Sequence, residues 1–319
     1  MTDTRMLFAP VADGLMAVEH CLMEAAEGRH PLLAEALRYV FETSGKRLRP
    51  AMVLLSGALG NYDLERLVLL ASSLEVVHTA SLVHDDTIDE ALTRRGLTTI
   101  SSLWDKHTAI VTGDFLFAKS ADLASRMNSV RIMKMLSETV MDMCSGEIQQ
   151  HGATNNWRLG VGEYLERIGA KTASLFAMCC AGAAVASGQD EQQIEALRRY
   201  GYNIGLAFQL VDDILDFTGD AGTLGKPAGN DLRQGTITLP AILFVQQLAA
   251  DAPLRMRLEH GEDAGLAAEL IRDSHALEAA RAYAYDAAEE ASRALDLFED
   301  SEPKRALLEI ADYLPNRTA

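Results

Sequence analysis

Proline is missing from a long central part of this chain. None of its 8 prolines lies between Pro50 and Pro227. Because proline is the residue that most reliably interrupts a helix, long helices are permitted across this half of the sequence. Between Asn61 and Arg95 glycine is missing as well, and apolar residues recur there at helical spacing. We therefore predict one long helix in that segment.

Cysteine and basic residues are also scarce. The 4 cysteines, Cys21, Cys144, Cys179 and Cys180, show neither CxxC nor Cys/His spacing, which argues against a disulfide framework or a zinc site. The 29 lysines and arginines are outnumbered by 46 aspartates and glutamates, giving a net charge of −17. Such acidity argues against binding of nucleic-acid phosphates. We expect reduced cysteines and no nucleic-acid partner.

Helical apolar spacing continues through most of the chain, and no segment shows the clear alternation of a strand. The strongest loop signal, Gly219–Gly235, is too short for a domain linker. With 48% hydrophobic residues the chain can build a large core. We predict an all-α fold with a single domain over 1–319. Its further helical segments are 129–150, 162–186, 190–218, 237–250 and 263–298.

Two aspartate triplets carry the strongest chemical signal in the sequence. Positions three and four apart share one face of a helix, so the carboxylates of a triplet can point the same way. Like charges placed in this way destabilise a helix unless a cation neutralises them, and Mg²⁺ prefers such oxygen ligands. The triplets are Asp85, Asp86 and Asp89, and Asp212, Asp213 and Asp216.

Each triplet could be a solvated acidic face or part of a metal site. Asp85 follows residues 81–84 and Asp212 follows 208–211, and both stretches are mainly apolar. Acids in such places favour the lining of a cleft. Two triplets on separate helices could face each other and hold Mg²⁺ for a diphosphate. Such a site suits ionisation of a diphosphate beside an apolar cavity that shields a carbocation from water.

Seven motifs occur in the order typical of one enzyme family. Each is weak alone, but all seven in order are specific. By these motifs the sequence resembles the polyprenyl synthetase family, the trans-isoprenyl diphosphate synthases, over most of its length. The motifs are Gly45–Pro50, Leu82–Asp89 with Arg94–Gly96, Gly113–Asp114, Gly146–Gln150, Lys171–Thr172, Phe208–Asp216 and Gly225–Pro227.

The resemblance implies both a fold and a reaction. The isoprenoid synthase fold is a bundle of long helices around a deep apolar cavity, with the two aspartate motifs facing each other at its mouth. The reaction is head-to-tail condensation of isopentenyl diphosphate with an allylic diphosphate such as farnesyl or geranylgeranyl diphosphate. The family uses Mg²⁺, as three ions once the allylic diphosphate is bound, and the departing diphosphate takes the final proton. A homodimer is implied as well.

The resemblance also assigns roles to single residues. The six aspartates become the metal ligands, and Thr172 and Gln209 join the catalytic and substrate-binding residues. The allylic diphosphate contacts are Arg94, Lys171 and Lys226. The residues of the isopentenyl diphosphate pocket are Lys46, Arg49, His78 and Arg95.

Plainer readings stay open for these side chains. The basic residues could be solvated surface groups, and His78, His84 and Gln209 could be buried groups with structural partners. Thr236 stands where many family members have a lysine, which leaves room for a non-catalytic subunit of the same fold. A terpene cyclase has no use for a second diphosphate pocket, so Lys46, Arg49 and Arg95 argue against that class.

The residues before the first triplet indicate product length. Leu74, Val77, Ala80 and Ser81 lie on the helical face that leads into the predicted cavity, and none is aromatic. One helical turn rises about 5.4 Å, close to the length of one five-carbon unit. In the family, large aromatics at these positions accompany short products. We therefore predict a long-chain product, with a geranylgeranyl-type enzyme as the alternative.

The location of the protein follows from what its segments lack. Residues 1–5 do not form a basic-then-apolar signal, and apolar runs are interrupted before they reach membrane-spanning length. A cytoplasmic protein is expected. Release of a hydrophobic product implies transient contact with a membrane, although no basic amphipathic helix marks where.

Overall fold

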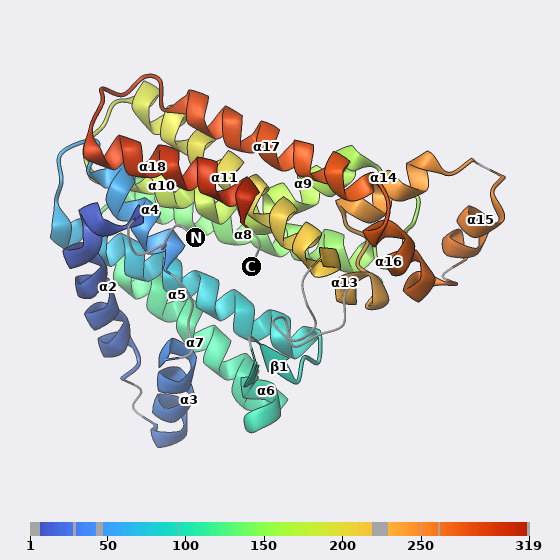
Figure 1. The fold of residues 1–319 in the computed structure, drawn as a ribbon. Helices are drawn as coiled ribbons and strands as arrows, with labels where there is room; N and C mark the ends of the chain where they lie inside the picture. Colours follow the sequence, from blue (N-terminus) through green and yellow to red (C-terminus); the bar gives the residue numbers. More distant parts are fainter. Residues whose placement is uncertain are drawn as a thin grey trace. The chain divides into compact units, whose positions relative to one another are not determined.

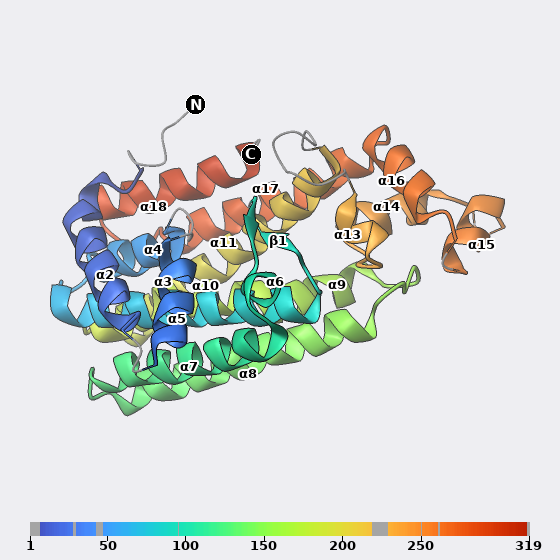
Figure 2. The same ribbon diagram turned by 90° about the horizontal axis from the view of Figure 1, so that it is seen from below.

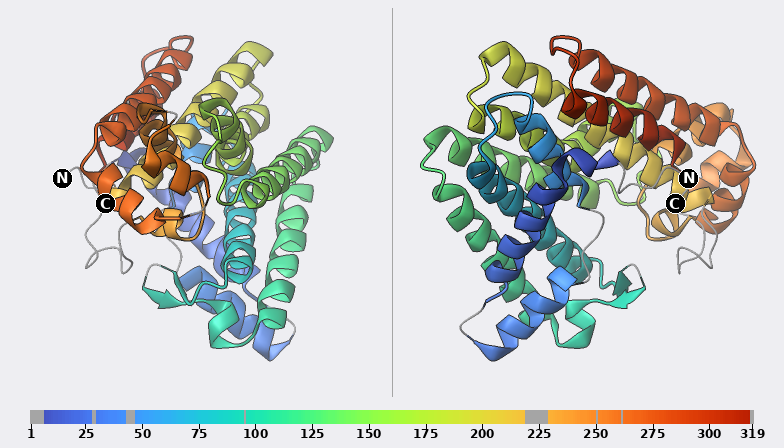
Figure 3. Two further views of the ribbon diagram at one scale, coloured as in Figure 1. Left: turned by 90° about the vertical axis from the view of Figure 1, so that its right-hand side faces the viewer. Right: turned by 60° about the vertical axis from the view of Figure 1, so that its left-hand side comes forward.

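The computed structural model describes residues 7–27, 30–42, 47–94, 96–218, 229–249, 251–260 and 262–317. These residues are almost entirely helical, which confirms the all-α prediction (Figures 1 and 2). The sheet in the described part is one antiparallel pair of two-residue strands, drawn as arrows in Figure 3. By their contacts the residues form two compact units. The single domain over 1–319 stays a prediction.

The first unit comprises Met1–Val140, Met178–Gly201 and Leu295–Glu309. Its long helices α5 and α7 pack against each other, and α5 also contacts α2 and α4. Its elements are η1 (Ala9–Val11), α2 (Ala12–Ala25), α3 (Pro31–Glu42), α4 (Leu48–Gly57), α5 (Leu64–Ile88), β1 (Thr93–Arg94), β2 (Leu97–Thr98), α6 (Ile100–Leu103) and α7 (Lys106–Ser125).

The second unit comprises Met141–Ala177, Tyr202–Ala294 and Ile310–Ala319. Its elements are α9 (Val161–Ile168), η2 (Gly169–Ala173), α13 (Asn230–Arg233), α14 (Leu239–Gln247), α15 (Pro253–Glu259), α16 (Ala264–Arg272), α17 (Ala276–Ala294) and η3 (Leu314–Asn316). Four helices have residues in both units, namely α8 (Val130–Gly152), α10 (Ser174–Ala186), α11 (Glu191–Thr218) and α18 (Glu302–Tyr313).

Helix α5 is shorter than the helix predicted through 61–95. It begins at Leu64 because the Asp63 carboxylate accepts a hydrogen bond from the Arg66 backbone N–H, at 3.2 Å. It ends at Ile88, and the chain then enters the β1–β2 ribbon. The Thr99 hydroxyl holds the ribbon's base by donating to the Ala91 carbonyl at 2.6 Å. The prediction of a helix beyond residue 89 was wrong, while the two-residue strands leave the all-α class unchanged.

The helix predicted over 263–298 is also interrupted. Helix α16 ends at Arg272 and α17 begins at Ala276. Between them the Ser274 hydroxyl donates to the Ile271 carbonyl at 2.8 Å and accepts from the Ala276 N–H at 3.2 Å. A short polar side chain that bonds to nearby backbone in this way ends one helix and starts the next.

Two helices have the length and composition of a membrane span. These are Leu64–Ile88, which is α5, and Val161–Ala186, the continuous helical run of α9, η2 and α10. However, 67% and 72% of their most apolar stretches are buried inside the protein. Long apolar helices of this kind are what a helical core requires, and burial of each leucine such as Leu67 or Leu70 contributes about 1.5–3 kcal/mol.

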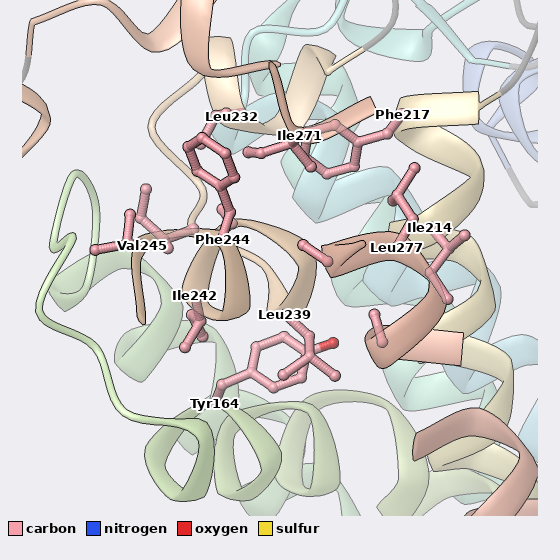
Figure 4. Close-up of a cluster of buried hydrophobic side chains, with 14 of the residues drawn as sticks. Tyr164, Ile214, Phe217, Leu232, Leu239, Ile242, Phe244, Val245, Ile271 and Leu277 are labelled. Carbon is pink, nitrogen blue, oxygen red and sulfur yellow. The ribbon is translucent and has the colours of Figure 1, made fainter. Parts of the chain in front are cut away.

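The second unit has its own apolar core, which contains the tyrosine ring of Tyr164 (Figure 4). Tyr164 from α9, Phe217 from α11 and Leu239 from α14 are each at most 1% exposed. Helix α17 contributes Leu277. This core joins helices that are distant in the sequence, and it fixes the helix segment that carries the second aspartate triplet.

The contact between α5 and α7 depends on Gly113. A Cβ atom at this position would lie 2.2 Å from His84 Nε2, and that nitrogen is 3.1 Å from the Ile110 carbonyl oxygen. The half-buried His84 therefore has a structural partner, in agreement with the plainer reading of this residue.

Gly113→Ala is expected to lower the free energy of unfolding by about 1–3 kcal/mol, because the added methyl group overpacks the α5–α7 contact. Gly162→Ala on α9 is the matched control, since nothing lies within 4 Å of a Cβ atom there. The control should leave stability unchanged or raise it slightly. Urea denaturation measures the free energy of unfolding of both variants. If the two substitutions changed it equally, the contact with His84 would not require a glycine at position 113.

Candidate active site

The first aspartate triplet lies at the C-terminal end of α5. Asp85 and Asp86 belong to its last turn, and Asp89 is the capping residue, whose N–H donates to the Asp85 carbonyl at 2.8 Å. Asp86 is buried, Asp85 is half-buried and Asp89 is exposed. The three carboxylates therefore differ in their access to solvent, although their spacing is the one expected for a shared helical face.

Asp86 is paired with Arg94, the predicted allylic diphosphate contact. Arg94 Nε is 2.8 Å from each of the two Asp86 carboxylate oxygens. The β1–β2 ribbon brings this arginine back to the helix end. A cation at a helix C-terminus is favourable, and it offsets the repulsion among neighbouring carboxylates. The structure thus brings together one predicted metal ligand and one predicted diphosphate ligand.

The second triplet lies in the last two turns of α11, and Asp213 is its buried member. Asp213 Oδ2 accepts from the Tyr164 hydroxyl at 2.7 Å, and Oδ1 accepts from Gln209 Nε2 at 2.7 Å. Burial raises the pKa of Asp213 to about 7, and Asp231 adds to the rise, whereas Tyr164, Gln209 and Arg167 oppose it. Both Asp213 oxygens therefore already accept hydrogen bonds from protein side chains.

Asp212 and Asp216 each have a contact that the sequence did not predict. Arg317, near the end of the chain, donates from Nη2 to Asp212 Oδ1, and its guanidinium carbon lies 5.1 Å from the centre of the Phe208 ring. Asp216 Oδ2 accepts from the backbone N–H of Asp231 at 3.2 Å. Protein groups therefore contact each carboxylate of this triplet.

Lys171 and Thr172 lie on a turn of π-helix, η2, between α9 and α10. Such turns occur often at functional sites because they widen a helix locally. The Lys171 ammonium forms an ion pair with Glu147, and a Cβ at Gly146 would lie 2.5 Å from the Lys171 backbone nitrogen. Two of the seven motifs, Gly146–Gln150 and Lys171–Thr172, therefore touch.

Thr172 also contacts the second triplet's helix. Its hydroxyl donates to Gln209 Oε1 at 2.9 Å, while Gln209 Nε2 donates to Asp213. The half-buried Gln209 amide thus has a partner on each side, as a buried amide requires. Three predicted site residues, from two of the seven motifs, are joined by hydrogen bonds.

The predicted isopentenyl diphosphate pocket is described only in part. Lys46 and Arg95 lie outside the described residues, as does Lys226 of the allylic set. Arg49 lies in the first turn of α4, and His78 is half-buried in α5. The neighbouring Arg47, which was given no role, donates to Glu19 and to Glu75, the latter at 3.0 Å.

The four residues predicted to set chain length lie along α5. Leu74 and Ala80 are fully buried, and Val77 is 1% exposed. Ser81 is half-buried, and its hydroxyl donates to the His78 carbonyl at 2.8 Å. The helical spacing expected for one face is therefore kept, and its apolar members lie inside the protein.

The donor chemistry of the triplets fits Mg²⁺ bound together with a diphosphate. Each triplet offers carboxylate oxygens alone, which hard cations prefer. Within the described ranges, no three His, Cys, Asp or Glu groups converge closely enough to hold a metal by themselves. Mg²⁺ commonly binds through one or two carboxylates and takes its other ligands from water and substrate phosphates. The residues present fit that mode.

Comparison with known proteins settles the family. The model of the family "Polyprenyl synthetase" matches residues 30–272, which is more than half of the chain. The chain belongs to the polyprenyl synthetase family. The resemblance inferred from the seven motifs is thereby confirmed, and with it the prenyl-transferring class of enzyme.

Related polyprenyl synthetases match over nearly the whole length. The chain is 40% identical to a prenyl transferase of Synechocystis over 321 residues, covering 99% of each. It is 37% identical to heptaprenyl diphosphate synthase component 2 of Bacillus subtilis over 315 residues, covering 98% of this chain and 90% of that protein. Among solved structures, the polyprenyl synthase of Caulobacter crescentus, complexed with calcium and isoprenyl diphosphate, superposes with a TM-score of 0.93. Its sequence identity is 34%, covering 99% of this chain and 98% of that one.

Sequence reasoning missed three side chains that contact predicted site residues. Tyr164 lies 49 residues before its partner Asp213, and Arg317 lies 105 residues after Asp212. Glu147 belongs to a recognised motif but was given no role. Neither tyrosine nor arginine carries a spacing signal, because each meets its carboxylate only through the fold.

Proposed function

We propose that this polyprenyl synthetase condenses isopentenyl diphosphate with an allylic diphosphate to form a long-chain trans-polyprenyl diphosphate. The observation that carries the proposal is the hydrogen-bonded group of Thr172 and Gln209 beside the second aspartate triplet. It places oxygen dipoles next to carboxylates suited to Mg²⁺. Family membership and the names of relatives, which include a heptaprenyl diphosphate synthase component, support the same reaction.

Two sets of side chains would bind the two diphosphates. Arg94, Lys171 and Lys226 would hold the allylic diphosphate, whose release starts the reaction. Guanidinium and ammonium groups bind an intact diphosphate without a metal, which suits the second substrate. The residues proposed for that isopentenyl diphosphate pocket are Lys46, Arg49, His78 and Arg95. Lys171 would exchange its ion pair with Glu147 for contact with the substrate.

Charge that develops during the reaction is stabilised at two places. Mg²⁺, when bound, would neutralise the departing diphosphate, and the residues proposed to hold it are Asp85, Asp86, Asp89, Asp212 and Asp216. Thr172 and Gln209 would direct oxygen lone pairs toward the allylic carbon as it becomes positive. The departing diphosphate accepts the proton that is lost, so no side-chain base is assigned. The partner of Asp86, Arg94, is half-buried and would exchange that contact for the allylic diphosphate. The partner Tyr164 of Asp213 is fully buried and has no such alternative, so Asp213 is left out of the ligand set.

Further proposals concern assembly and surroundings. We propose three Mg²⁺ ions in the complex with the allylic diphosphate, a homodimer, a cytoplasmic location and brief membrane contact at product release. These follow from the family resemblance and from the acidic chain with its hydrophobic product. A chain that needs a different partner subunit is a second candidate, favoured by the name "component 2" of a relative and by Thr236.

The decisive experiment incubates the purified chain with Mg²⁺, farnesyl diphosphate and radiolabelled isopentenyl diphosphate. Diphosphate release and chain elongation are measured together, and thin-layer chromatography gives the product length. We expect elongation by the chain alone to products longer than geranylgeranyl diphosphate. Accumulation of geranylgeranyl diphosphate would favour the short-chain alternative. Activity that appears only with a second subunit would favour the partner-dependent candidate.

A further inference from the structure

A continuous series of three hydrogen bonds runs through the second unit from Tyr164 to Thr172. The Tyr164 hydroxyl donates to Asp213 Oδ2 at 2.7 Å. Gln209 Nε2 donates to Asp213 Oδ1 at 2.7 Å, and the Thr172 hydroxyl donates to Gln209 Oε1 at 2.9 Å. The series starts in the apolar core and ends at two side chains proposed to face the reacting carbon.

The chemistry of the groups fixes the direction of each bond. Both oxygens of Asp213 accept hydrogen bonds, Oδ2 from the Tyr164 hydroxyl and Oδ1 from the NH₂ group of Gln209, which is the arrangement in which the carboxyl acts only as an acceptor. The amide oxygen then faces Thr172 and accepts the hydrogen bond that the threonine hydroxyl donates. A flipped amide would place its carbonyl oxygen against the carboxylate. Asp213, as the acceptor of both bonds, thus orients Gln209 and, through it, Thr172.

Tyr164 is the inner anchor of this series. It is fully buried in the apolar core (Figure 4), and the Arg167 guanidinium carbon lies 5.3 Å from its ring centre. Burial and the neighbouring Asp213 raise the pKa of Tyr164 well above its ordinary value, so the hydroxyl keeps its proton and donates. Asp213 is itself only 3% exposed, so Tyr164 and Gln209 supply donors that solvent cannot easily replace.

We infer that Tyr164 is a positioning residue for prenyl transfer, which acts through Asp213 to fix the orientation of Gln209 and Thr172. The inference rests on the proposed function for its catalytic consequence, while the orientation itself is a property of the folded chain. Tyr164 is fully buried, so its assigned role is not contact with a substrate. Its effect is to keep lone pairs of the two polar side chains directed at the developing positive charge.

Tyr164→Phe tests the inference, because phenylalanine keeps the ring in the core and removes only the hydroxyl. We expect kcat to fall about tenfold, in line with the loss of one hydrogen bond to a charged group. KM for both diphosphates should stay within about twofold, since the diphosphate ligands are untouched. A fall confined to KM would overturn the inference.

Tyr200→Phe is the matched control. Tyr200 is also fully buried, and its hydroxyl donates to the Leu307 carbonyl at 2.8 Å, within the first unit. Both variants lose one buried tyrosine hydrogen bond, so both should lower the melting temperature, Tyr164→Phe by at least as much because its partner is a carboxyl group. Only Tyr164→Phe should lower kcat. An equal fall in kcat for the two variants would assign the effect to stability and overturn the inference.

A double-mutant cycle with Thr172→Val tests the connection between the two ends of the series. If Tyr164 acts through Gln209 and Thr172, the double variant should be little worse than Thr172→Val alone. Fully additive losses of kcat would mean that Tyr164 acts by another route.

A spectroscopic measurement separates this inference from the proposed function. In NMR spectra of ¹⁵N-labelled protein, the signals of the Gln209 side-chain amide are assigned as the ones that disappear in the Gln209→Leu variant. They should shift in Tyr164→Phe and stay in place in Tyr200→Phe. Unmoved signals in Tyr164→Phe would overturn the positioning role. If the parent protein elongates no prenyl chain, the proposed function fails, and these signals still decide whether Tyr164 orients Gln209.

Discussion

Asp85→Asn is expected to lower the rate of prenyl transfer by about 10²–10³-fold, the usual cost of removing one group that stabilises transition-state charge. The change keeps the side-chain volume at the end of α5 and removes one carboxylate of the first triplet. If Asp85 holds Mg²⁺ for the allylic substrate alone, the dissociation constant of isopentenyl diphosphate should change by less than about threefold, because arginine and lysine bind that diphosphate without metal. Steady-state kinetics and isothermal titration calorimetry measure the two quantities.

Glu90→Gln is the control for this change. Glu90 lies just beyond the triplet, is exposed and pairs with Lys106 at 2.5 Å. The substitution removes the same charge from nearly the same part of the chain without touching the motif. Its rate should match that of the parent protein. If Asp85→Asn weakened isopentenyl diphosphate binding as much as it lowered turnover, the division of the two diphosphate sites would be wrong.

Ala80→Phe should change the product rather than the rate. A phenyl group about one turn before the first triplet would block the predicted cavity at that depth. Each helical turn of cavity that is lost, about 5.4 Å, would exclude roughly one five-carbon unit of the product. We expect a distribution shifted to shorter prenyl chains, with the parent length strongly reduced. Thin-layer chromatography of dephosphorylated products measures it.

Because Ala80 is fully buried, the phenyl group could instead overpack the core at a cost of about 1–3 kcal/mol. Ser81→Phe is a second test that avoids this problem, because Ser81 is only half-buried and lies on the same predicted face. Ala80→Val adds less volume and should shorten the product less than phenylalanine does. Folded Ala80→Phe and Ser81→Phe proteins with an unchanged product distribution would contradict the chain-length assignment.

The helical character of the fold was accessible from sequence because it depends on local periodicity. The absence of proline and the apolar spacing predicted α5 and α11; α11 has nearly the expected bounds, whereas α5 ends several residues earlier than predicted. The same reasoning failed where a single polar side chain redirects the backbone. Thr99 closes the β1–β2 ribbon and Ser274 separates α16 from α17 through short-range hydrogen bonds that periodicity does not register.

The chemistry of the site was likewise visible in part. The sequence alone was enough to recognise the family and the two aspartate triplets, because helical spacing and motif order are properties of the linear sequence. It also singled out Thr172 and Gln209, but it could not supply their partners.

Only the tertiary structure decided what each carboxylate faces. Helical spacing could not say what Asp212, Asp213 and Asp216 each contact. The fold turns Asp213 to Tyr164 and Gln209, and it brings Arg317 to Asp212. Neighbours on one helix project in directions about 100° apart, so adjacent aspartates meet different surroundings. Which surroundings those are depends on groups far away in the chain, and packing alone brings them together.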